Sequence, residues 1–559
     1  MKRALAMIAL VAAAARADEL KTPPPVVPGE WRATEVPGFV VYGNVDERTL
    51  YDVAGNLSRL RAVLAHTAAG LDTGSERPIP VFAFRHSDEF RPYAPAGNKR
   101  LDGFFANAYG YRAIALDLTR PGADESIYHE LVHHVVRRNF GDVPLWFNEG
   151  IATLYETFRC GTSTATVGWV PRSRIVWFDA HPLVAVKKLA VVTTDDPDYN
   201  EADRAGTFYL ESWLLVHDLL FGHPSRGPEL AAYLKLVHDG RKADEALETA
   251  FTGGSAGLDA ELSSYIKTGS FPYTDISFSD LRVPSPTTAR KVGRVEALGA
   301  LGGLALVARP HDPSSARAHF EAALAEAPGD ARARAGLGAV GVLQKRYGEG
   351  LRDIELAIEG GADEPALLVL GSRAILDMEH EESGGHIEKG KLPSANVLRA
   401  RDWLEHAIKA EPFDDAALKI YGLTFLAADD DPAHGIAAFE RADAIDPLDD
   451  GSLYDLLQLY VRRKDRAKSE ALFATRIEPK ARPEIVARAR ETLLRLDYED
   501  AREALDAGDY DRAIVLVHTI RDKTSDEALR ARMVELSGKV EAAAAAKKKR
   551  ATAVSKPKR

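Results

Sequence analysis

Apolar and polar positions alternate with two different periods in the first part of the chain. Short apolar runs at 39–42 and 79–84 predict strands. Between them, residues 46–69 place leucine and valine at helical spacing, which predicts an amphipathic helix. Two further segments, 103–105 and 111–118, predict a strand pair or hairpin. We therefore expect a mixed sheet with a helix between its strands.

The next segment, 124–136, predicts a buried helix that carries His129-Glu130-Leu131-Val132-His133. Histidines four residues apart project from one helical face, where both imidazoles reach one metal ion. Glu130 follows the first histidine, a place from which a carboxylate can take a proton from water. A second helix from residue 145 places Glu149 sixteen residues after His133, and a turn near Pro144 can bring it back to the histidines. The alternative is a buried helix whose histidines only form hydrogen bonds.

At these residues the chain resembles a family. The run 129–133, followed by Leu-Trp-Phe-Asn-Glu-Gly-Ile-Ala at 145–152, is similar to the gluzincin zinc metallopeptidases in their thermolysin-like, peptidase MA-like form. The resemblance covers 124–156, with weaker similarity to about residue 235. It implies His129, His133 and Glu149 as zinc ligands and Glu130 as general base. The gap before Glu149 is shorter than in the best-known members, so their substrate specificity is not carried over.

A helix is also predicted over 207–220, and its Tyr-x-x-Ser-Trp pattern is similar to the helix after the active site in peptidase MA-like proteins. A hydrolase of this kind needs a donor for the oxyanion that forms on the substrate. Tyr209 is one candidate and His217 another, and both residue types are also common as structural groups. The strand residues 113–116 are our candidate for a sheet edge that binds extended substrate; plain scaffold is the alternative. Residues 161–205 are expected to form loops beside the cleft.

From about residue 289 the pattern becomes helical and repeats. Small and apolar positions recur after 34 residues in one pair of segments and after 35 in another, which resembles the tetratricopeptide repeat. Residues 379–393 interrupt one unit, and an unrelated helical bundle is the alternative. A repeat array offers a surface for peptides or protein segments. The recurring positions are Ala316, Phe320, Ala323 and Pro328 with Gly350, Ile354, Ala357 and Ala362, and Ala400, Leu404, Ala407 and Pro412 with Gly435, Phe439, Ala442 and Pro447.

The ends of the chain carry different signals. Residues 1–17 combine Lys2 and Arg3, an apolar run and an Ala-Arg-Ala ending, the layout of a secretory signal peptide. Export to the periplasm or the extracellular space is therefore expected. Cys160 is the only cysteine, so no intrachain disulfide can form. A net charge of -11 argues against a nucleic-acid binder, and no transmembrane segment is expected.

The patterns predict an α+β fold with a mixed sheet followed by an all-α solenoid, and the resemblances imply that these are a thermolysin-like metallopeptidase domain with zinc-binding helices and a tetratricopeptide-like array. The expected function is an exported zinc (Zn²⁺) metallopeptidase that hydrolyses protein or peptide substrates, with a protein partner on the repeats. The alternative is a non-catalytic envelope scaffold that acts through the repeats. The expected segments are a signal peptide at 1–17, a Pro-rich leader at 18–30, the peptidase domain at 31–275, a linker at 276–290, repeats at 291–540 and a basic disordered tail at 541–559.

Overall fold

The chain divides into two units, Met1–Ala374 and Ile375–Arg559, which are described separately. The domain boundaries expected from the sequence stay predictions. The predicted signal peptide and most of the leader lie outside the described residues. The computed structural model describes residues 27, 29–67, 77–95, 101–108, 111–119, 123–141, 143–193, 196–200, 202–383, 392–479 and 481–554.

A six-stranded mixed sheet forms one layer of the first unit, in the order β4-β5-β3-β2-β1-β9. β2, β3 and β5 run parallel, whereas β1, β4 and β9 pair antiparallel with their neighbours. The predicted strands are present, and two strands without a prediction, β1 and β9, extend the sheet. The strands are β1 (Arg32–Val36), β2 (Phe39–Gly43), β3 (Ile79–Phe84), β4 (Gly103–Ala108), β5 (Tyr111–Asp117) and β9 (Arg290–Lys291).

The helix α2 (Glu47–Thr67) connects the parallel strands β2 and β3. Its leucines pack on sheet residues such as Val41, Val81 and Ile114, which follow one another across neighbouring strands. These side chains are fully buried, because alternate residues of a strand point to the same face. The sheet therefore provides a rigid, well-packed layer on which the following helices pack.

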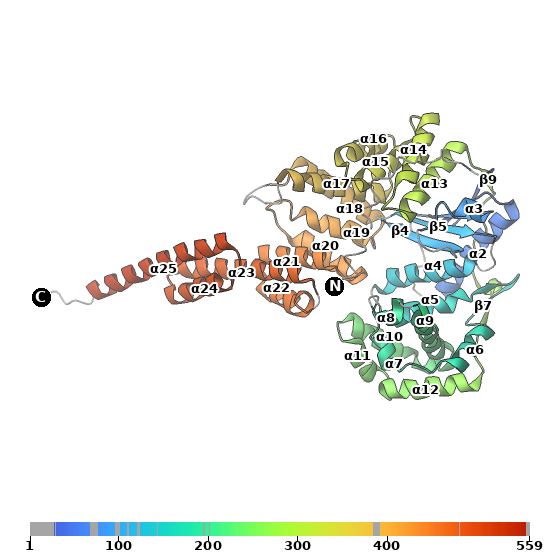
Figure 1. Ribbon diagram of the computed structural model, residues 1–559, viewed down its shortest axis with the longest axis horizontal. Helices are drawn as coiled ribbons and strands as arrows, with labels where there is room; N and C mark the ends of the chain where they lie inside the picture. Colours follow the sequence, from blue (N-terminus) through green and yellow to red (C-terminus); the bar gives the residue numbers. More distant parts are fainter. Residues whose placement is uncertain are drawn as a thin grey trace. The chain divides into compact units, whose positions relative to one another are not determined.

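Three helices form successive layers beyond the sheet: α4 (Ala123–Phe140), α5 (Leu145–Glu156) and α9 (Ala202–His217). α4 contacts β4 and β5 on one side and α5 on the other, and α5 packs on α9 (Figure 1). α4 ends at Gly141, whose positive φ of 65° is one that glycine adopts without strain. Pro144 then precedes α5, so the chain reverses within four residues, as predicted.

The section 161–205 is less irregular than predicted. It contains β7 (Thr164–Val167), which pairs with β6 (Arg159–Cys160) and β8 (Thr274–Ser277) in a small second sheet. Further helical segments complete this part of the unit, namely α6 (Arg172–Ala180), α7 (Val186–Ala190), α8 (Pro197–Asn200), η1 (Asp218–Gly222), η2 (Pro224–Arg226), α10 (Gly227–His238), α11 (Ala243–Ala250) and α12 (Gly254–Thr268).

Paired helices with short connections begin at α13 and confirm the repeat prediction. Their close approach depends on the small residues that define the repeat. A Cβ added to Gly338 would lie 2.7 Å from the Ile354 side chain, and one added to Gly422 would lie 2.5 Å from Phe439. In the first unit the pairs are α13 (Arg294–Ala308) with α14 (Ser314–Glu326) and α15 (Ala331–Leu343) with α16 (Tyr347–Glu359).

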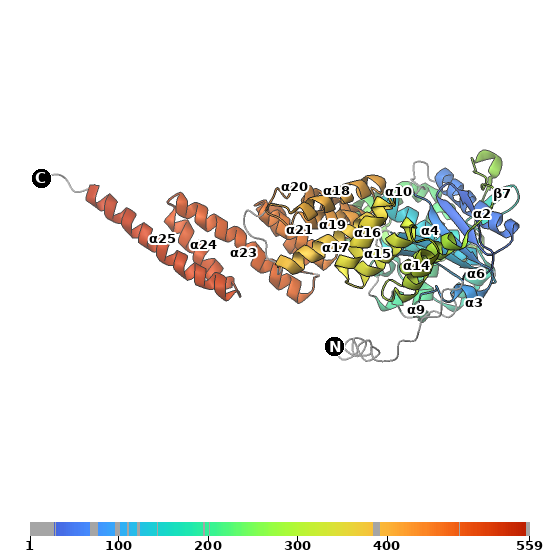
Figure 2. The same cartoon turned by 90° about the horizontal axis from the view of Figure 1, so that it is seen from above.

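The second unit continues the same pattern. In its last part α23 packs on α24, and α24 packs on α25 (Figure 1 and Figure 2). α25 continues to Val554, past the predicted start of a disordered tail at 541. Among the helices that the structure describes, none is long and apolar enough to cross a membrane. The helices are α17 (Pro365–Ser383), which spans the unit boundary, α18 (Ala395–Ala410), α19 (Asp415–Thr424), α20 (Ala433–Ile445), α21 (Asp450–Arg462), α22 (Arg466–Leu472), α23 (Pro483–Asp506), α24 (Tyr510–Lys523) and α25 (Glu527–Val554).

Candidate metal centre

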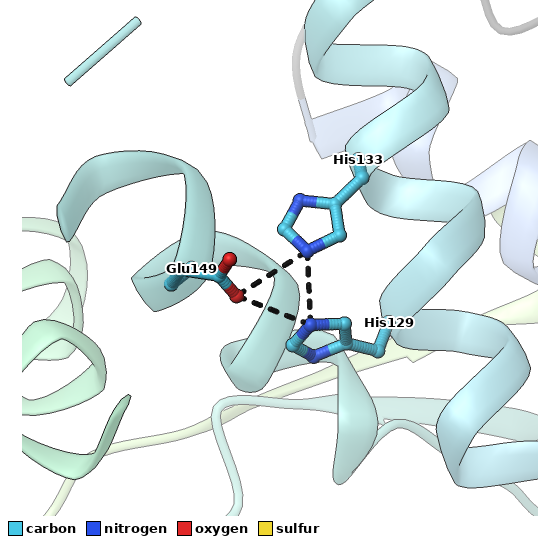
Figure 3. A group of neighbouring side chains, drawn as sticks. All are labelled: His129, His133 and Glu149. Carbon is cyan, nitrogen blue, oxygen red and sulfur yellow. Dashed lines mark hydrogen bonds and ion pairs between the residues drawn. The ribbon is translucent and has the colours of Figure 1, made fainter. Parts of the chain in front are cut away.

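Two histidines of α4 and one glutamate of α5 converge on a single point (Figure 3). The Nε2 atoms of His129 and His133 are 2.9 Å apart. Glu149 Oε2 is 3.3 Å from each of these nitrogens. The reversal between α4 and α5 therefore brings together three residues that the sequence predicted as ligands of one ion.

The close packing of α5 on α9 fixes the depth of Glu149. The next residue, Gly150, faces the backbone of α9, and a Cβ there would lie only 2.3 Å from the Ser212 carbonyl oxygen. No side chain larger than hydrogen fits this crossing without a shift of one helix. Glu149 is consequently held with 4% of its surface exposed.

Each histidine has an outer ring nitrogen, Nδ1, and an inner one, Nε2, which lies near Glu149. A proton held on Nδ1 leaves the Nε2 of a neutral ring with a free lone pair. His133 Nδ1 is 2.9 Å from Asn148 Oδ1, which can only accept a hydrogen bond, so Nδ1 carries the proton. His129 Nδ1 is 2.9 Å from Glu156 Oε1, although the direction of this contact is not ideal for a hydrogen bond. In the neutral rings both Nε2 lone pairs then point at each other and at Glu149.

Burial and charge have opposite effects on these groups. Burial alone would raise the pKa of Glu149, but its close contacts with His129 and His133 outweigh burial and lower the pKa to about 2. Burial alone would lower the pKa of His129, but its close contacts with Glu149 and Glu156 raise the pKa to about 9. A cation, either a proton or a metal ion, is thus strongly favoured among the three side chains.

A second layer of residues supports the three predicted ligands. Glu156 Oε2 accepts a hydrogen bond of 2.6 Å from Arg174, and Arg174 also donates to the Thr153 carbonyl oxygen at 3.0 Å. Asn148, Glu156 and Arg174 were not predicted from the sequence. Asn148 and Glu156 lie on the same helix as Glu149, one residue before it and seven residues after it, so helical spacing could have indicated them. Arg174 comes from the section expected to be loop.

Two tyrosines lie beside the glutamate. Tyr199 donates a hydrogen bond of 3.1 Å to Glu149 Oε1 and is also hydrogen-bonded to Tyr209. The Tyr209 ring lies 6.4 Å from that of His129, centroid to centroid. Burial raises the pKa of Tyr209, and the Glu149 charge raises it further, so this phenol keeps its proton. Tyr209, predicted from the sequence, therefore lies at the site, and Tyr199 is an addition.

The structure places Glu130 next to His129 on α4, half-buried. Its negative charge contributes to the raised pKa of both Tyr199 and Tyr209. Its proposed part in proton transfer stays a prediction.

His217 does not belong to this centre. It is fully buried, and its two nitrogens are 2.8 Å from the Tyr265 hydroxyl and 2.8 Å from the Gly168 carbonyl oxygen. Burial lowers the pKa of His217 to about 4, so the ring is neutral and structural. Of the two oxyanion donors considered from the sequence, only Tyr209 is near the ligands.

The expected substrate edge is also placed differently. Residues 113–116 belong to β5, which pairs with β3 on one side and β4 on the other, so β5 has no free edge. The prediction was wrong because the preceding strand, β4, folds back over β5 as an antiparallel hairpin. β4 is the edge strand on this side of the sheet.

No protein-family model matches the chain, and no curated protein matches it. Solved structures do match, and those compared are tetratricopeptide proteins. A protein of Thermus thermophilus is 18% identical, covers 36% of this chain and 99% of its own, and gives a TM-score of 0.25. pilF of Pseudomonas aeruginosa is 16% identical, covers 43% of this chain and 97% of its own, and gives a TM-score of 0.29. A Parabacteroides merdae protein is 16% identical, covers 44% of this chain and 98% of its own, and gives a TM-score of 0.27. These likenesses concern the fold of the helical repeats alone.

Proposed function

We propose that the first unit binds zinc through His129, His133 and Glu149 and hydrolyses peptide bonds. The single observation that carries this proposal is the convergence of the three ligand atoms. Glu149 Oε2 is buried and accepts no well-formed hydrogen bond, and it lies 3.3 Å from two imidazole nitrogens that also face each other. Two nitrogens and one carboxylate oxygen are a donor set that zinc prefers in catalytic sites, with a position left for water.

The residues around the ligands have separate tasks in the proposed reaction. Zinc, when bound, supplies Lewis acidity that polarises the substrate carbonyl and lowers the pKa of water. Glu130 accepts the proton of the attacking water and passes it to the leaving amine. The protonated phenol of Tyr209 donates a hydrogen bond to the developing oxyanion. Tyr199 holds the outer oxygen of Glu149 and thereby fixes the direction of the inner one.

Cleavage of an unstructured protein tests this proposal. Wild type is expected to cleave casein, and Glu130→Gln is expected to cleave it at least about 100-fold more slowly, because the general base is lost. Glu245→Gln is the matched control, since Glu245 is an exposed carboxylate on α11. Equal rates in wild type and Glu130→Gln would contradict the assigned role.

A second candidate function is protein binding by the repeats, and the likeness to tetratricopeptide proteins concerns this part of the chain. In the second unit a groove of about 630 Å³ lies between α21, α23 and the start of α25. Three arginines line it: Arg488, Arg495 and Arg532. Among the described residues none of the three forms an ion pair, and Arg488 lies 4.5 Å above the Tyr454 ring. The groove suits a peptide with acidic side chains.

The three acidic residues of the groove already form hydrogen bonds or ion pairs, and Asp526 accepts a hydrogen bond of 3.1 Å from the Leu529 backbone. Glu491 accepts hydrogen bonds from the Thr524 hydroxyl and from the Ser525 backbone and hydroxyl. Glu499 lies 3.6 Å from Lys464 and 3.9 Å from Arg502. The guanidinium groups of the three arginines are therefore the charged groups of the groove that can donate hydrogen bonds to a ligand.

Binding of a fluorescent oligoglutamate peptide tests the second candidate. We expect the double variant Arg488→Glu with Arg495→Glu to bind at least about tenfold more weakly than wild type, because charged hydrogen bonds are lost. The double variant Arg352→Glu with Arg463→Glu, at two exposed arginines outside the groove, is the control for net charge. If both variants bind equally weakly, general charge and not the groove explains the binding.

A further inference from the structure

A second group of potential metal ligands lies where α9 ends. The helix changes there to the π-helical turn η1, and Asp218 at its start and His223 just after its end come together, with His223 Nδ1 2.8 Å from Asp218 Oδ1. Glu261 of α12 completes the group, with its Oε1 atom 3.3 Å from the same nitrogen. One imidazole nitrogen and two carboxylate oxygens therefore converge here, whereas the first centre has two imidazole nitrogens and one carboxylate oxygen.

This group differs from an ordinary surface ion pair because one of its carboxylates is buried. The Asp218 side chain is 0% exposed, and its second oxygen, Oδ2, accepts no hydrogen bond from the described residues. A buried carboxylate oxygen without a donor is costly, so an additional positive partner is expected. His223 is 44% exposed, which leaves the site open to solvent on one side.

The carboxylates around the group outnumber its one arginine, so an additional cation would be favourable. Arg226 donates hydrogen bonds of 2.6 Å to Glu261 Oε2 and of 2.6 Å to Glu229 Oε2, and a longer one of 3.3 Å to Glu261 Oε1. Its one guanidinium charge is shared between the carboxylates of Glu229 and Glu261, and Asp218 is the third carboxylate of this cluster. A bond from outside to the far oxygen of a ligating carboxylate is also the usual arrangement around protein-bound metals. Arg226 thus fixes Glu261 with Oε1 directed at His223.

The group is separate from the first centre. Tyr209, which lies beside His129, and His217 are both part of α9, and Asp218 follows His217 directly. Eight residues of helix between Tyr209 and His217 correspond to about 12 Å. His217 itself is held by Tyr265 and Gly168 and contributes no ligand to either group.

We propose that Asp218, His223 and Glu261 bind a divalent metal ion, zinc by preference, that joins the end of α9 to α12. The imidazole ligand favours zinc over calcium or magnesium, which prefer oxygen ligands alone. Its place between two helices, away from Tyr209 and His129, gives the ion a structural task. This proposal does not depend on the proposed function of the first centre.

Zinc content of full-length protein tests the proposal. The measurement is made after dialysis against low micromolar free zinc, in a His133→Ala background that removes the first centre. We expect one zinc per chain in His133→Ala and none after His223→Gln is added. His238→Gln, at an exposed histidine of α10, is the matched control and should keep the ion. Asp218→Asn, which is nearly the same size, should also lose it.

Two results would overturn the proposal. One is the absence of zinc from the His133→Ala protein, which would leave a protonated His223 as the cation between the two carboxylates. The other is retention of one zinc after His223→Gln, which would place the ion elsewhere. Circular dichroism of each variant separates metal loss from unfolding. A failure of the first centre would appear instead as unchanged zinc content between wild type and His133→Ala.

Discussion

At the residue scale, the protons on the Nδ1 atoms of His129 and His133 decide whether the two Nε2 atoms can bind a cation. Asn148 fixes one tautomer of His133, and the Glu156 carboxylate, held by Arg174, lies 2.9 Å from His129 Nδ1 and favours a proton there by its charge. Both inner nitrogens are then acceptors at 2.9 Å from each other, an arrangement that is unfavourable unless a cation lies between them. We therefore expect the supporting residues to contribute to the affinity for the proposed metal ion, although they are not among its proposed ligands.

Glu156→Gln tests this contribution. The amide keeps the size of the side chain but loses the charge that holds His129 and Arg174. We expect zinc affinity, measured by competition with a chromophoric chelator, to fall roughly 10- to 100-fold. Glu245→Gln should leave the affinity unchanged. An unaltered affinity in Glu156→Gln would show that the carboxylate only packs against Arg174.

A buried carboxylate on α9 makes stability depend on pH. Glu211 is 4% exposed and accepts a hydrogen bond of 2.7 Å from the Val184 backbone. Burial raises its pKa to about 7. A carboxyl group with a raised pKa stabilises the fold below its unfolded pKa near 4.5, and this contribution is lost as pH rises through 7. The loss amounts to roughly 3 kcal/mol.

Glu211→Gln should remove that pH dependence. The amide oxygen can still accept the Val184 hydrogen bond, and the side chain no longer ionises. The Tm of the variant minus that of wild type is therefore expected to be more positive at pH 8 than at pH 5. A difference that is equal at both pH values would mean that Glu211 ionises in the fold as easily as in the unfolded chain.

At the element scale, the crossing of α5 and α9 sets the position of Glu149. Gly150→Ala is expected to destabilise the protein by about 1–3 kcal/mol, because the added methyl meets the Ser212 backbone. Gly299→Ala, in α13, is the matched control, since a Cβ there meets nothing within 4 Å. That substitution should stabilise by up to about 1 kcal/mol through helix propensity. Comparable Tm values for the two variants would contradict the tight crossing.

Local patterns allowed most elements to be predicted. Apolar runs indicated β2, β3, β4 and β5, and the spacing of His129, His133 and Glu149 indicated the candidate ligands. Strand neighbours were not predictable in the same way. β9 pairs with β1 across more than 250 residues of sequence, and β5 became an interior strand only because β4 folds over it.

The supporting residues show the same limit. Tyr199 reaches Glu149 from a four-residue helix inside a section predicted to be loop, and Arg174 comes from another short helix of that section. Neither has a periodic pattern around it that points to the centre. Their positions follow from tertiary packing, which single-sequence patterns do not contain.

At the scale of the whole molecule, the proposed chemistry and the arginine groove belong to different units. We therefore expect their effects to separate. Glu130→Gln should leave oligoglutamate binding unchanged, and the Arg488→Glu, Arg495→Glu double variant should leave the hydrolysis of short neutral peptides unchanged. Anisotropy and peptide-cleavage assays on the same preparations would measure both. A joint loss in either variant would mean that the two units act as one.

Zinc content measured in a His223→Gln background, which leaves only the first centre, tests the zinc proposal most directly. With His129, His133 and Glu149 intact, one zinc per chain is expected, and His133→Ala in the same background should contain none. Glu130→Gln should keep the ion, because Glu130 is not a ligand. Absence of zinc from the His223→Gln protein, or its retention after His133→Ala, would contradict the metal centre and leave protein binding by the repeats as the function of the chain.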